Sequence, residues 1–322
     1  MIKIGLFGIG HLGKIHLRIL KGLNQHFTIV GFHDIDAEAS QIVAAEHGIA
    51  YFPNADDLLG QIDALDIVIP TPFHFALAKK AICMQKHVFV EKPVTQTVDE
   101  SQELLQLLQS FPVVFQVGHV ERFNPAYVAA SPLLHAPEFI ETHRLAQFNP
   151  RGTDVPVVLD LMIHDLDIIL HVVKSPVKSV SASGVAVVSS SHDITNARLE
   201  FENGTVANLT ASRISLKNMR KSRFFQRDAY VGIDFLNKSI EVVRLEALVG
   251  EPDPYDMVLE LGQGKPSKKL SIESPAIYPT NAIEEELKEF AQAIAKGTRV
   301  SVDLQAGHDA LELAYRILNL LQ

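Results

Sequence analysis

The stretch that decides the fold of this chain is Ile2-Lys3-Ile4-Gly5-Leu6-Phe7-Gly8-Ile9-Gly10-His11-Leu12-Gly13. Residues 2–7 have the apolar pattern of a buried strand, and residues 14–20 have helical spacing. The glycines between them form a G-x-G-x-x-G motif. Its first glycine allows a tight turn, its second lets the backbone approach a pyrophosphate, and its third lets the helix pack on the strand. The stretch therefore predicts a dinucleotide site at a helix N-terminus, where unpaired N–H groups attract phosphate.

The next predicted strand, 27–33, supports this interpretation because it ends at Asp34. An acid about 20 residues beyond the glycines is well placed to bind the ribose hydroxyls of the adenosine. Its carboxylate would repel the 2′-phosphate of NADP, and residues 33, 35 and 36 supply no arginine to bind that phosphate. We therefore expect NAD as the cofactor.

Composition narrows the class of protein. A chain of 322 residues suits two domains, and a net charge of -9 argues against nonspecific binding to nucleic acid or to an anionic membrane. The single cysteine, Cys83, excludes an internal disulfide, so we expect the protein in a reducing cytoplasm. We expect Cys83 itself to be a small core residue on a helix. No leader pattern and no apolar run of about 18 residues is evident, so we expect no membrane partner.

Residues 1–122 alternate between predicted strands and helices. Further strands are expected at 49–52, 64–69, 87–90 and 113–117, with helices near 36–48, 56–59, 74–85 and 98–109. Apolar strands in this order predict a parallel sheet covered on both faces by helices, a doubly wound α/β fold. Ligands bind at the carboxyl ends of such strands, where the glycine motif, Asp34, residues 70–74 and residues 91–93 all fall.

Residues 123–322 follow a different pattern. Helices are predicted from Pro125 and over 158–172, 282–295 and 304–321, and 250–269 is expected to be a loop or hairpin tip. Strands are predicted at 139–144, 177–188, 195–201, 205–212 and 239–248, with more inside 223–235. Asn203-Gly204 is a strong hairpin signal. The pattern predicts a second, α+β domain with a largely antiparallel sheet, whose last helix can pack back on the first domain.

Two stretches could carry chemistry. Lys92, in Glu91-Lys92-Pro93, lies at the cofactor edge and is restricted to extended geometry by the proline; the alternative is a solvated lysine. Asp160 and His164 are i and i+4 on the predicted helix 158–172, so they share one face. Because their neighbours are nearly all apolar, we favour a helix that lines a cleft, with His164 able to titrate near neutral pH, over a solvent-facing edge.

A metal site is not expected, because Asp160, His164 and His171 match no standard ligand spacing. Basic residues suggest an anionic ligand instead, since arginine matches phosphate oxygens bidentately. Scattered surface arginines are the alternative. The candidate substrate-binding residues are Arg122, Asn124, Arg144, Arg151, Asp160 and His164.

Five stretches resemble the glucose–fructose oxidoreductase/inositol dehydrogenase (Gfo/Idh/MocA) family. They are residues 8–13, Pro70-Thr71-Pro72-Phe73-His74, Glu91-Lys92-Pro93-Val94, Asp160-Leu161-Met162-Ile163-His164, and the predicted helix that begins at Asn281. The resemblance implies an N-terminal Rossmann domain and a C-terminal domain built on a large open sheet. It also implies a nicotinamide cofactor, hydride transfer at a sugar or polyol C–H, and assembly into dimers or tetramers through the open sheet face.

The resemblance also implies roles for individual residues. Lys92 would contact nicotinamide and substrate beside a cis proline bond, while Asp160 and His164 would orient the substrate and move the proton, with either Lys92 or His164 as the base. The residues implied to bind the cofactor are Gly8, Gly10, His11, Leu12, Gly13, Asp34, Pro70, Thr71, His74, Glu91 and Lys92.

Residues 118–126 and 151–165 resemble a narrower group, the dehydrogenases that act on C3 of a nucleotide sugar such as UDP-N-acetylglucosamine in lipid A or surface-glycan biosynthesis. Two alternatives stay open. One is a dehydrogenase of a free sugar or an inositol-like polyol. The other is a non-catalytic NAD-binding regulator that has kept the glycine motif.

Overall fold

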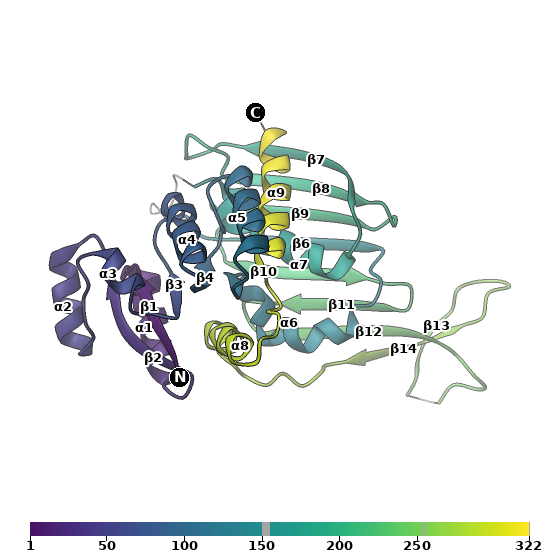
Figure 1. Cartoon of the computed structure of the whole chain (residues 1–322). Helices are drawn as coiled ribbons and strands as arrows, with labels where there is room; N and C mark the ends of the chain where they lie inside the picture. Colours follow the sequence, from purple (N-terminus) through teal and green to yellow (C-terminus); the bar gives the residue numbers. More distant parts are fainter. Residues whose placement is uncertain (150–154, 254, 322) are drawn as a thin grey trace. The chain divides into compact units, whose positions relative to one another are not determined.

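The structure, a computed structural model, describes residues 1–149, 155–253 and 255–321 (Figure 1). Its contacts divide the chain into two compact units. The first consists of Met1–Phe123 and Thr280–Glu312, and the second of Asn124–Pro279 and Leu313–Gln322. The break after Phe123 lies one residue from the predicted boundary. Residues 280–312, which the sequence pattern assigned to the second domain, group with the first unit instead.

The first unit contains a five-stranded sheet in the order β2-β1-β3-β4-β5, and every neighbouring pair is parallel. Its strands are β1 (Ile2–Phe7), β2 (Phe27–His33), β3 (Ala64–Ile67), β4 (His87–Glu91) and β5 (Phe115–Gly118). The predicted doubly wound fold is confirmed, and the four predicted site segments follow strands that all end at one edge. The strand predicted at 49–52 is wrong: Tyr51 makes only an isolated bridge to Phe32, just before Pro53, which has no N–H to continue a ladder.

Local signals place the helices of this unit. They are α1 (His11–Gly22), α2 (Ala37–His47), α3 (Ala55–Leu59), α4 (His74–Cys83), α5 (Val98–Ser110) and α8 (Ala282–Lys296), with 3-10 turns η1 (Thr71–Phe73) and η2 (Val120–Phe123). Asp36 caps α2, Gly48 ends it in the left-handed region, and Thr97 forms a capping box on α5. Cys83 is exposed rather than buried, because α4 turns its Ala78, Ala81 and Ile82 face to the core.

Helix α8 supplies part of the first unit's core although it comes late in the chain. Its Leu287 and Phe290 are fully buried in one cluster with Phe27 and Phe89. The Phe290 ring lies 6.5 Å from that of Phe27 and 5.9 Å from that of Phe89. The contacts of α8 explain why residues 282–296 group with the first unit.

The second unit contains a nine-stranded sheet in the order β13-β14-β12-β11-β10-β6-β9-β8-β7. Its strands are β6 (Phe139–Leu145), β7 (Val177–Val185), β8 (Ile194–Phe201), β9 (Val206–Ser212), β10 (Met219–Phe225), β11 (Ala229–Asp234), β12 (Ser239–Ala247), β13 (Met257–Leu259) and β14 (Lys268–Glu273). Only the pair of β6 and β9 is parallel, which confirms the predicted antiparallel character. The Asn203-Gly204 turn joins β8 to β9, with Gly204 at a φ of 89°.

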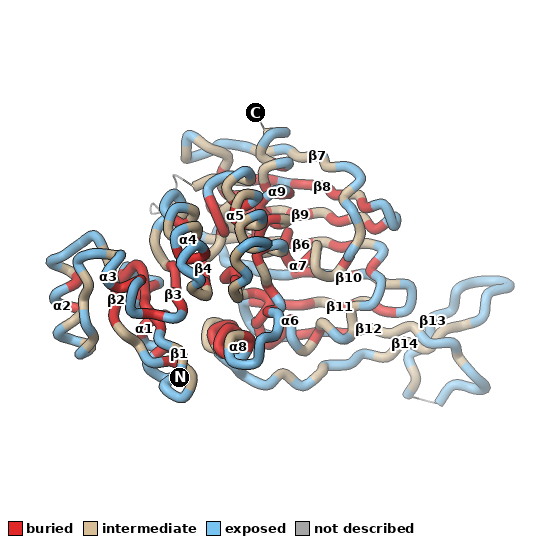
Figure 2. The backbone as a smooth tube through the Cα atoms, viewed as in Figure 1, coloured by how far each residue is buried: buried red, intermediate tan, exposed pale blue. Residues whose placement is uncertain are grey.

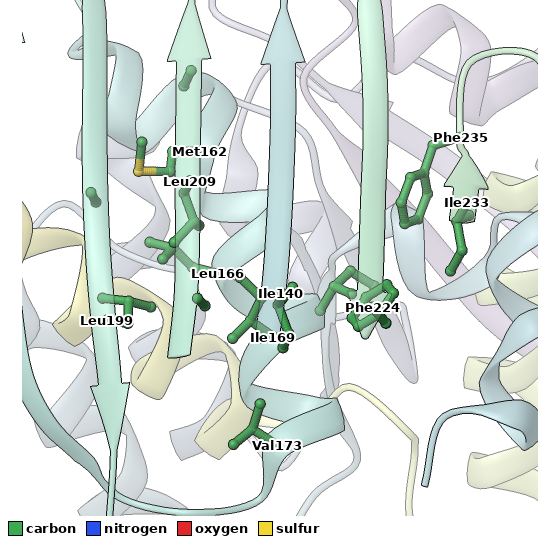
Figure 3. Packing of buried hydrophobic residues seen from close by; sticks show 14 of the residues in the cluster. Ile140, Met162, Leu166, Ile169, Val173, Leu199, Leu209, Phe224, Ile233 and Phe235 are labelled. Atoms are coloured by element: carbon green, nitrogen blue, oxygen red, sulfur yellow. The ribbon is translucent and has the colours of Figure 1, made fainter. Parts of the chain in front are cut away.

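One face of this sheet is covered by α6 (Pro125–Ala130), α7 (Ile163–Val173) and the last part of α9 (Leu304–Asn319). Figure 3 shows Leu166 and Ile169 of α7 packed against Leu199, Leu209 and Ile140 of the strands. Burial alternates along β8, so every second side chain belongs to this core. The tube in Figure 2 is coloured red where the chain is buried. Over the described ranges of the chain, no helix is both long and apolar enough to cross a membrane.

Candidate cofactor and catalytic site

The glycine motif forms the turn between β1 and α1, and two of its glycines have no room for a side chain. Gly8 has a φ of +99°, and a Cβ there would lie 2.5 Å from the carbonyl oxygen of Val68. A Cβ on Gly13 would lie 2.2 Å from the carbonyl oxygen of Gly8. Gly10 is different, because its Cβ would meet nothing within 4 Å. The loop is therefore packed against the protein at Gly8 and Gly13 and open at Gly10.

Gly10 is the N-cap of α1, and no side chain caps this helix end. The first N–H groups of α1 therefore have no side-chain cap, and the partial positive charge of a 12-residue helix lies at this end. A pyrophosphate fits this arrangement in charge and in hydrogen-bonding capacity. His11 and Leu12, both predicted to bind the cofactor, begin this helix and are exposed.

Asp34 lies beside the loop, as predicted, and it also holds the loop in place. Its Oδ2 accepts a hydrogen bond of 2.7 Å from the backbone N–H of Ile9, and its Oδ1 accepts one of 2.9 Å from Asp36. A carboxylate oxygen has two lone pairs, so each can accept a second bond from a ribose hydroxyl. The sequence indicated a ribose ligand here but not the bond to Ile9.

The segments after β3 and β4 are joined through His74. Its ring nitrogens lie 2.9 Å from the carbonyl oxygen of Pro93 and 2.8 Å from that of Ile69, and the residue is 1% exposed. Burial lowers the pKa of His74, against the effect of these carbonyls. His74 was predicted to bind the cofactor. Its buried ring holds the Pro93 segment in place. Pro70, another predicted cofactor residue, is exposed, and Thr71 is half-buried.

Lys92 is half-buried and directly precedes Pro93 through a cis peptide bond. Its backbone N–H donates a hydrogen bond of 3.3 Å to Glu91 Oε2. The other carboxylate oxygen of Glu91 lies 3.3 Å from Nε2 of His16, whose Nδ1 lies 2.9 Å from Asp66 Oδ2. Sequence reasoning missed His16 and Asp66, although a charged residue inside the apolar strand Ala64–Ile67 was an available signal.

Asp160 and His164 come from the second unit. The helix predicted over 158–172 is interrupted: Val158–Met162 forms a π-helical turn that holds Asp160, and α7 begins at Ile163. Both side chains are half-buried, in contrast to the buried Ile163 and Met162 around them. The wider turn changes the angle between Asp160 and His164 from that of a regular α-helix, and such turns are frequent at functional sites.

Several predicted substrate ligands have partners within the protein. Arg144 is 3% exposed, and its Nε and Nη2 donate bonds of 3.0 and 2.9 Å to the two oxygens of Asp165. Asn124 caps α6 through a bond of 3.1 Å from Ala126 N, and it donates one of 3.0 Å to Phe235 O. These contacts give both residues a structural role, and their contact with a substrate stays a prediction.

Two candidates for binding an anionic ligand remain, Arg122 and Arg151. Arg122 lies in η2 and is 9% exposed. Arg151 falls outside the described residues. The ring of His171, part of the rejected metal set, lies 2.5 Å from the Tyr127 hydroxyl. Where side chains are described, no cluster of three metal-binding groups occurs.

A parallel sheet whose glycine loop opens the first helix, with an acid after the second strand, defines the class of Rossmann dinucleotide-binding proteins. Residues 2–119 match the family described as "Oxidoreductase family, NAD-binding Rossmann fold", and residues 140–226 match the GFO/IDH/MocA C-terminal domain. The chain belongs to this GFO/IDH/MocA family of oxidoreductases.

Relatives of known activity extend the comparison. The chain is 35% identical over 320 residues to UDP-N-acetylglucosamine 3-dehydrogenase of Acidithiobacillus ferrooxidans, covering 98% of this chain and 96% of that protein. A solved structure of that dehydrogenase superposes with a TM-score of 0.88 at 33% identity and covers 99% and 97% of the two chains. The scyllo-inositol 2-dehydrogenase of Bacillus subtilis is 29% identical over 66% of this chain and 68% of that protein. A levoglucosan dehydrogenase in complex with NADH and levoglucosan, 16% identical with a TM-score of 0.83, shares the fold, covering 99% of this chain and 96% of that chain.

Proposed function

We propose that the protein is an NAD-dependent dehydrogenase that oxidises a secondary hydroxyl, at C3, of a nucleotide sugar such as UDP-N-acetylglucosamine. The observation that carries this proposal is the 35% identity to a UDP-N-acetylglucosamine 3-dehydrogenase over nearly the whole of both chains. Inositol dehydrogenases also match, but at lower identity.

The first unit offers the groups that would hold NAD. The open N-terminus of α1 at Gly10 suits the pyrophosphate, and Asp34 suits the ribose hydroxyls. The Asp34 carboxylate also disfavours the 2′-phosphate of NADP. When bound, NAD accepts the hydride.

Three side chains would carry the proton chemistry. Lys92 donates a hydrogen bond to the oxygen that loses its proton and stabilises the charge that develops there. His164 accepts the proton, and Asp160 orients the sugar or tunes the base. In a second version of the same proposal, Lys92 is the base and His164 donates the hydrogen bond to the substrate oxygen. Arg122 is the described candidate for the diphosphate of the substrate.

The test is a turnover assay with NAD and a panel of UDP-sugars and free polyols, followed by NADH absorbance. We expect NADH formation with UDP-N-acetylglucosamine and a loss of turnover by orders of magnitude in Lys92→Met and His164→Ala, with NADH binding kept. Matched controls are Lys178→Met and His135→Ala, which remove the same groups from exposed positions. Near-normal turnover in both site variants would contradict the assignment. Activity on myo-inositol alone would indicate a polyol dehydrogenase, and no activity on any sugar would indicate a regulator.

We further propose that the protein forms a homo-oligomer through the sheet face opposite the helices. Phe225, which is 37% exposed, groups there with Phe139 and Tyr230, their rings 5.8 and 5.1 Å from its own. An exposed aromatic group of this kind favours contact with another protein surface. Light scattering is expected to give a dimer or tetramer, which Phe225→Glu weakens. A wild-type monomer would contradict the proposal.

A further inference from the structure

Four titratable side chains from four elements meet inside the first unit, beneath the strand end that carries Lys92. His16 comes from α1, Asp66 from β3, Glu91 from β4 and Glu286 from α8. The His16 ring lies between two carboxylates, with Nδ1 2.9 Å from Asp66 and Nε2 3.3 Å from Glu91. His16, Asp66 and Glu286 are fully buried, and the Glu91 side chain is 13% exposed. Such groups are costly to bury unless their charges compensate each other.

The charges in this cluster follow from its geometry. Burial alone would lower the pKa of the His16 imidazole, but Asp66 and Glu91 outweigh burial and hold that pKa well above its ordinary value. Burial, together with the nearby Glu91 carboxylate, holds the pKa of Glu286 well above its ordinary value. Burial also raises the pKa of Asp66, against the effect of His16. The two acids on either side of the His16 ring therefore stabilise its protonated form.

The Glu91 carboxylate is held from several sides. Its Oε2 accepts the backbone N–H of Lys92, and its Oε1 faces His16. Toward β5, a Cβ on Gly118 would lie 2.9 Å from Oε1 and 3.0 Å from Cδ, so the carboxylate fits only because residue 118 has no side chain. The position of this carboxylate therefore bears directly on the backbone of Lys92.

We propose that His16 is a positioning residue for the dehydrogenase reaction. Asp66 holds the His16 ring, the ring fixes the Glu91 carboxylate, and this carboxylate fixes the backbone of Lys92. Since α1 begins at the glycine loop, the same contact ties the helix that receives the cofactor to the strand end that carries Lys92. A displacement of about 1 Å in such a support can lower turnover about a hundredfold. This inference rests on the proposed function, in which Lys92 contacts the substrate.

The test uses the full-length enzyme with NAD and UDP-N-acetylglucosamine. His16→Gln keeps much of the side-chain length but removes the cation, and we expect kcat to fall about 10- to 100-fold. Because glutamine cannot carry the proton that His16 holds between two acids, the kcat–pH profile is expected to shift relative to that of the wild-type enzyme. His47→Gln, a half-buried histidine on α2, is the matched control and is expected to leave both quantities unchanged.

A second measurement needs no folded variant. Long-range proton–nitrogen NMR of the wild-type imidazoles, with the His16 signal assigned by selective labelling, is expected to show both His16 ring nitrogens still protonated above the pH at which an ordinary imidazole has lost its proton. A His16 ring that titrates near its ordinary value would overturn the proposal.

The kinetic outcomes separate this inference from the proposed function. Normal turnover in Lys92→Met would refute the role of Lys92 and with it the positioning role. If Lys92→Met is inactive while folded His16→Gln keeps its kcat within about twofold, only the inference fails. A lower kcat with an unmoved kcat–pH profile would indicate general loss of structure and would also count against the inference.

Discussion

The glycine loop allows fold and cofactor binding to be perturbed separately. In Gly13→Ala the new Cβ would lie 2.2 Å from the Gly8 carbonyl oxygen, where real contacts of this kind are not shorter than 3.0 Å. The loop must therefore open by about 0.8 Å, and because the obstacle is backbone, no side chain can move aside. Such overpacking costs about 1 to 3 kcal/mol. In Gly10→Ala the Cβ enters open space, and Gly10 has an unstrained φ of -63°.

Two small effects oppose each other in Gly10→Ala. Alanine restricts the unfolded chain, which stabilises by about 0.4 to 1 kcal/mol, while it is a poorer N-cap than glycine by a similar amount. We therefore expect the free energy of unfolding to change by less than about 0.5 kcal/mol. The methyl group would stand where the pyrophosphate is proposed to lie, so the Kd for NADH should rise at least tenfold, about 1.4 kcal/mol.

The assay pairs urea unfolding with an NADH titration. Unfolding is followed by far-UV circular dichroism, because the chain has no tryptophan. Gly13→Ala is expected to lose both stability and binding, and Gly10→Ala binding alone. Wild-type affinity in folded Gly10→Ala would place the cofactor elsewhere, and wild-type stability in Gly13→Ala would refute the packing argument.

Three further predictions concern single carboxyl groups. Asp34→Ser removes the charge that repels a 2′-phosphate, so the ratio of kcat/KM for NAD over NADP should fall at least about tenfold; an unchanged ratio would exclude Asp34 from cofactor choice. Asp165→Asn removes the negative charge and replaces one of the two acceptors of buried Arg144 with an amide NH2, which cannot accept a hydrogen bond. Urea unfolding should therefore show a loss of about 3 kcal/mol, and a loss under about 1 would show that the pair is not structural. Burial holds the pKa of Glu286 above its unfolded value, so the folded state binds the proton more tightly and wild-type stability falls as pH rises from about 4.3 through the folded pKa. The melting temperature of Glu286→Gln should therefore exceed that of the wild type at about pH 8 and be close to it at about pH 4. A difference in melting temperature that does not change with pH would contradict the raised pKa of Glu286.

Much of the first unit could be predicted from the sequence because its signals are local. Apolar strands, a glycine motif and helix caps such as Asp36 depend on neighbouring residues, and strand ends of a parallel sheet meet at one edge regardless of distant detail. The cofactor side of the candidate site therefore followed from the sequence. The strand predicted at 49–52 failed because a ladder needs a partner, which its own residues do not specify.

Partners across the chain could not be predicted in this way. Arginines were grouped as phosphate ligands, yet the partner of Arg144 is Asp165, which lies on another element. The direction of the Asp165 side chain toward this arginine depends on how α7 packs on the sheet. The π-helical turn at Asp160 and the contact of His16 with Glu91 likewise depend on tertiary packing. These are the features that fix the geometry of the candidate catalytic residues.

The place of α8 in the chain has a consequence for the order in which the protein is made. Phe290 and Leu287 fill the core beside Phe27 and Phe89, but the ribosome adds them after all nine strands of the second unit. At bacterial or eukaryotic elongation rates, roughly ten to thirty seconds pass between Phe123 and Thr280. During that interval the nascent glycine loop belongs to a sheet with an uncovered apolar surface. A nascent chain arrested before α8 is therefore expected to bind chaperones more strongly than one arrested after it.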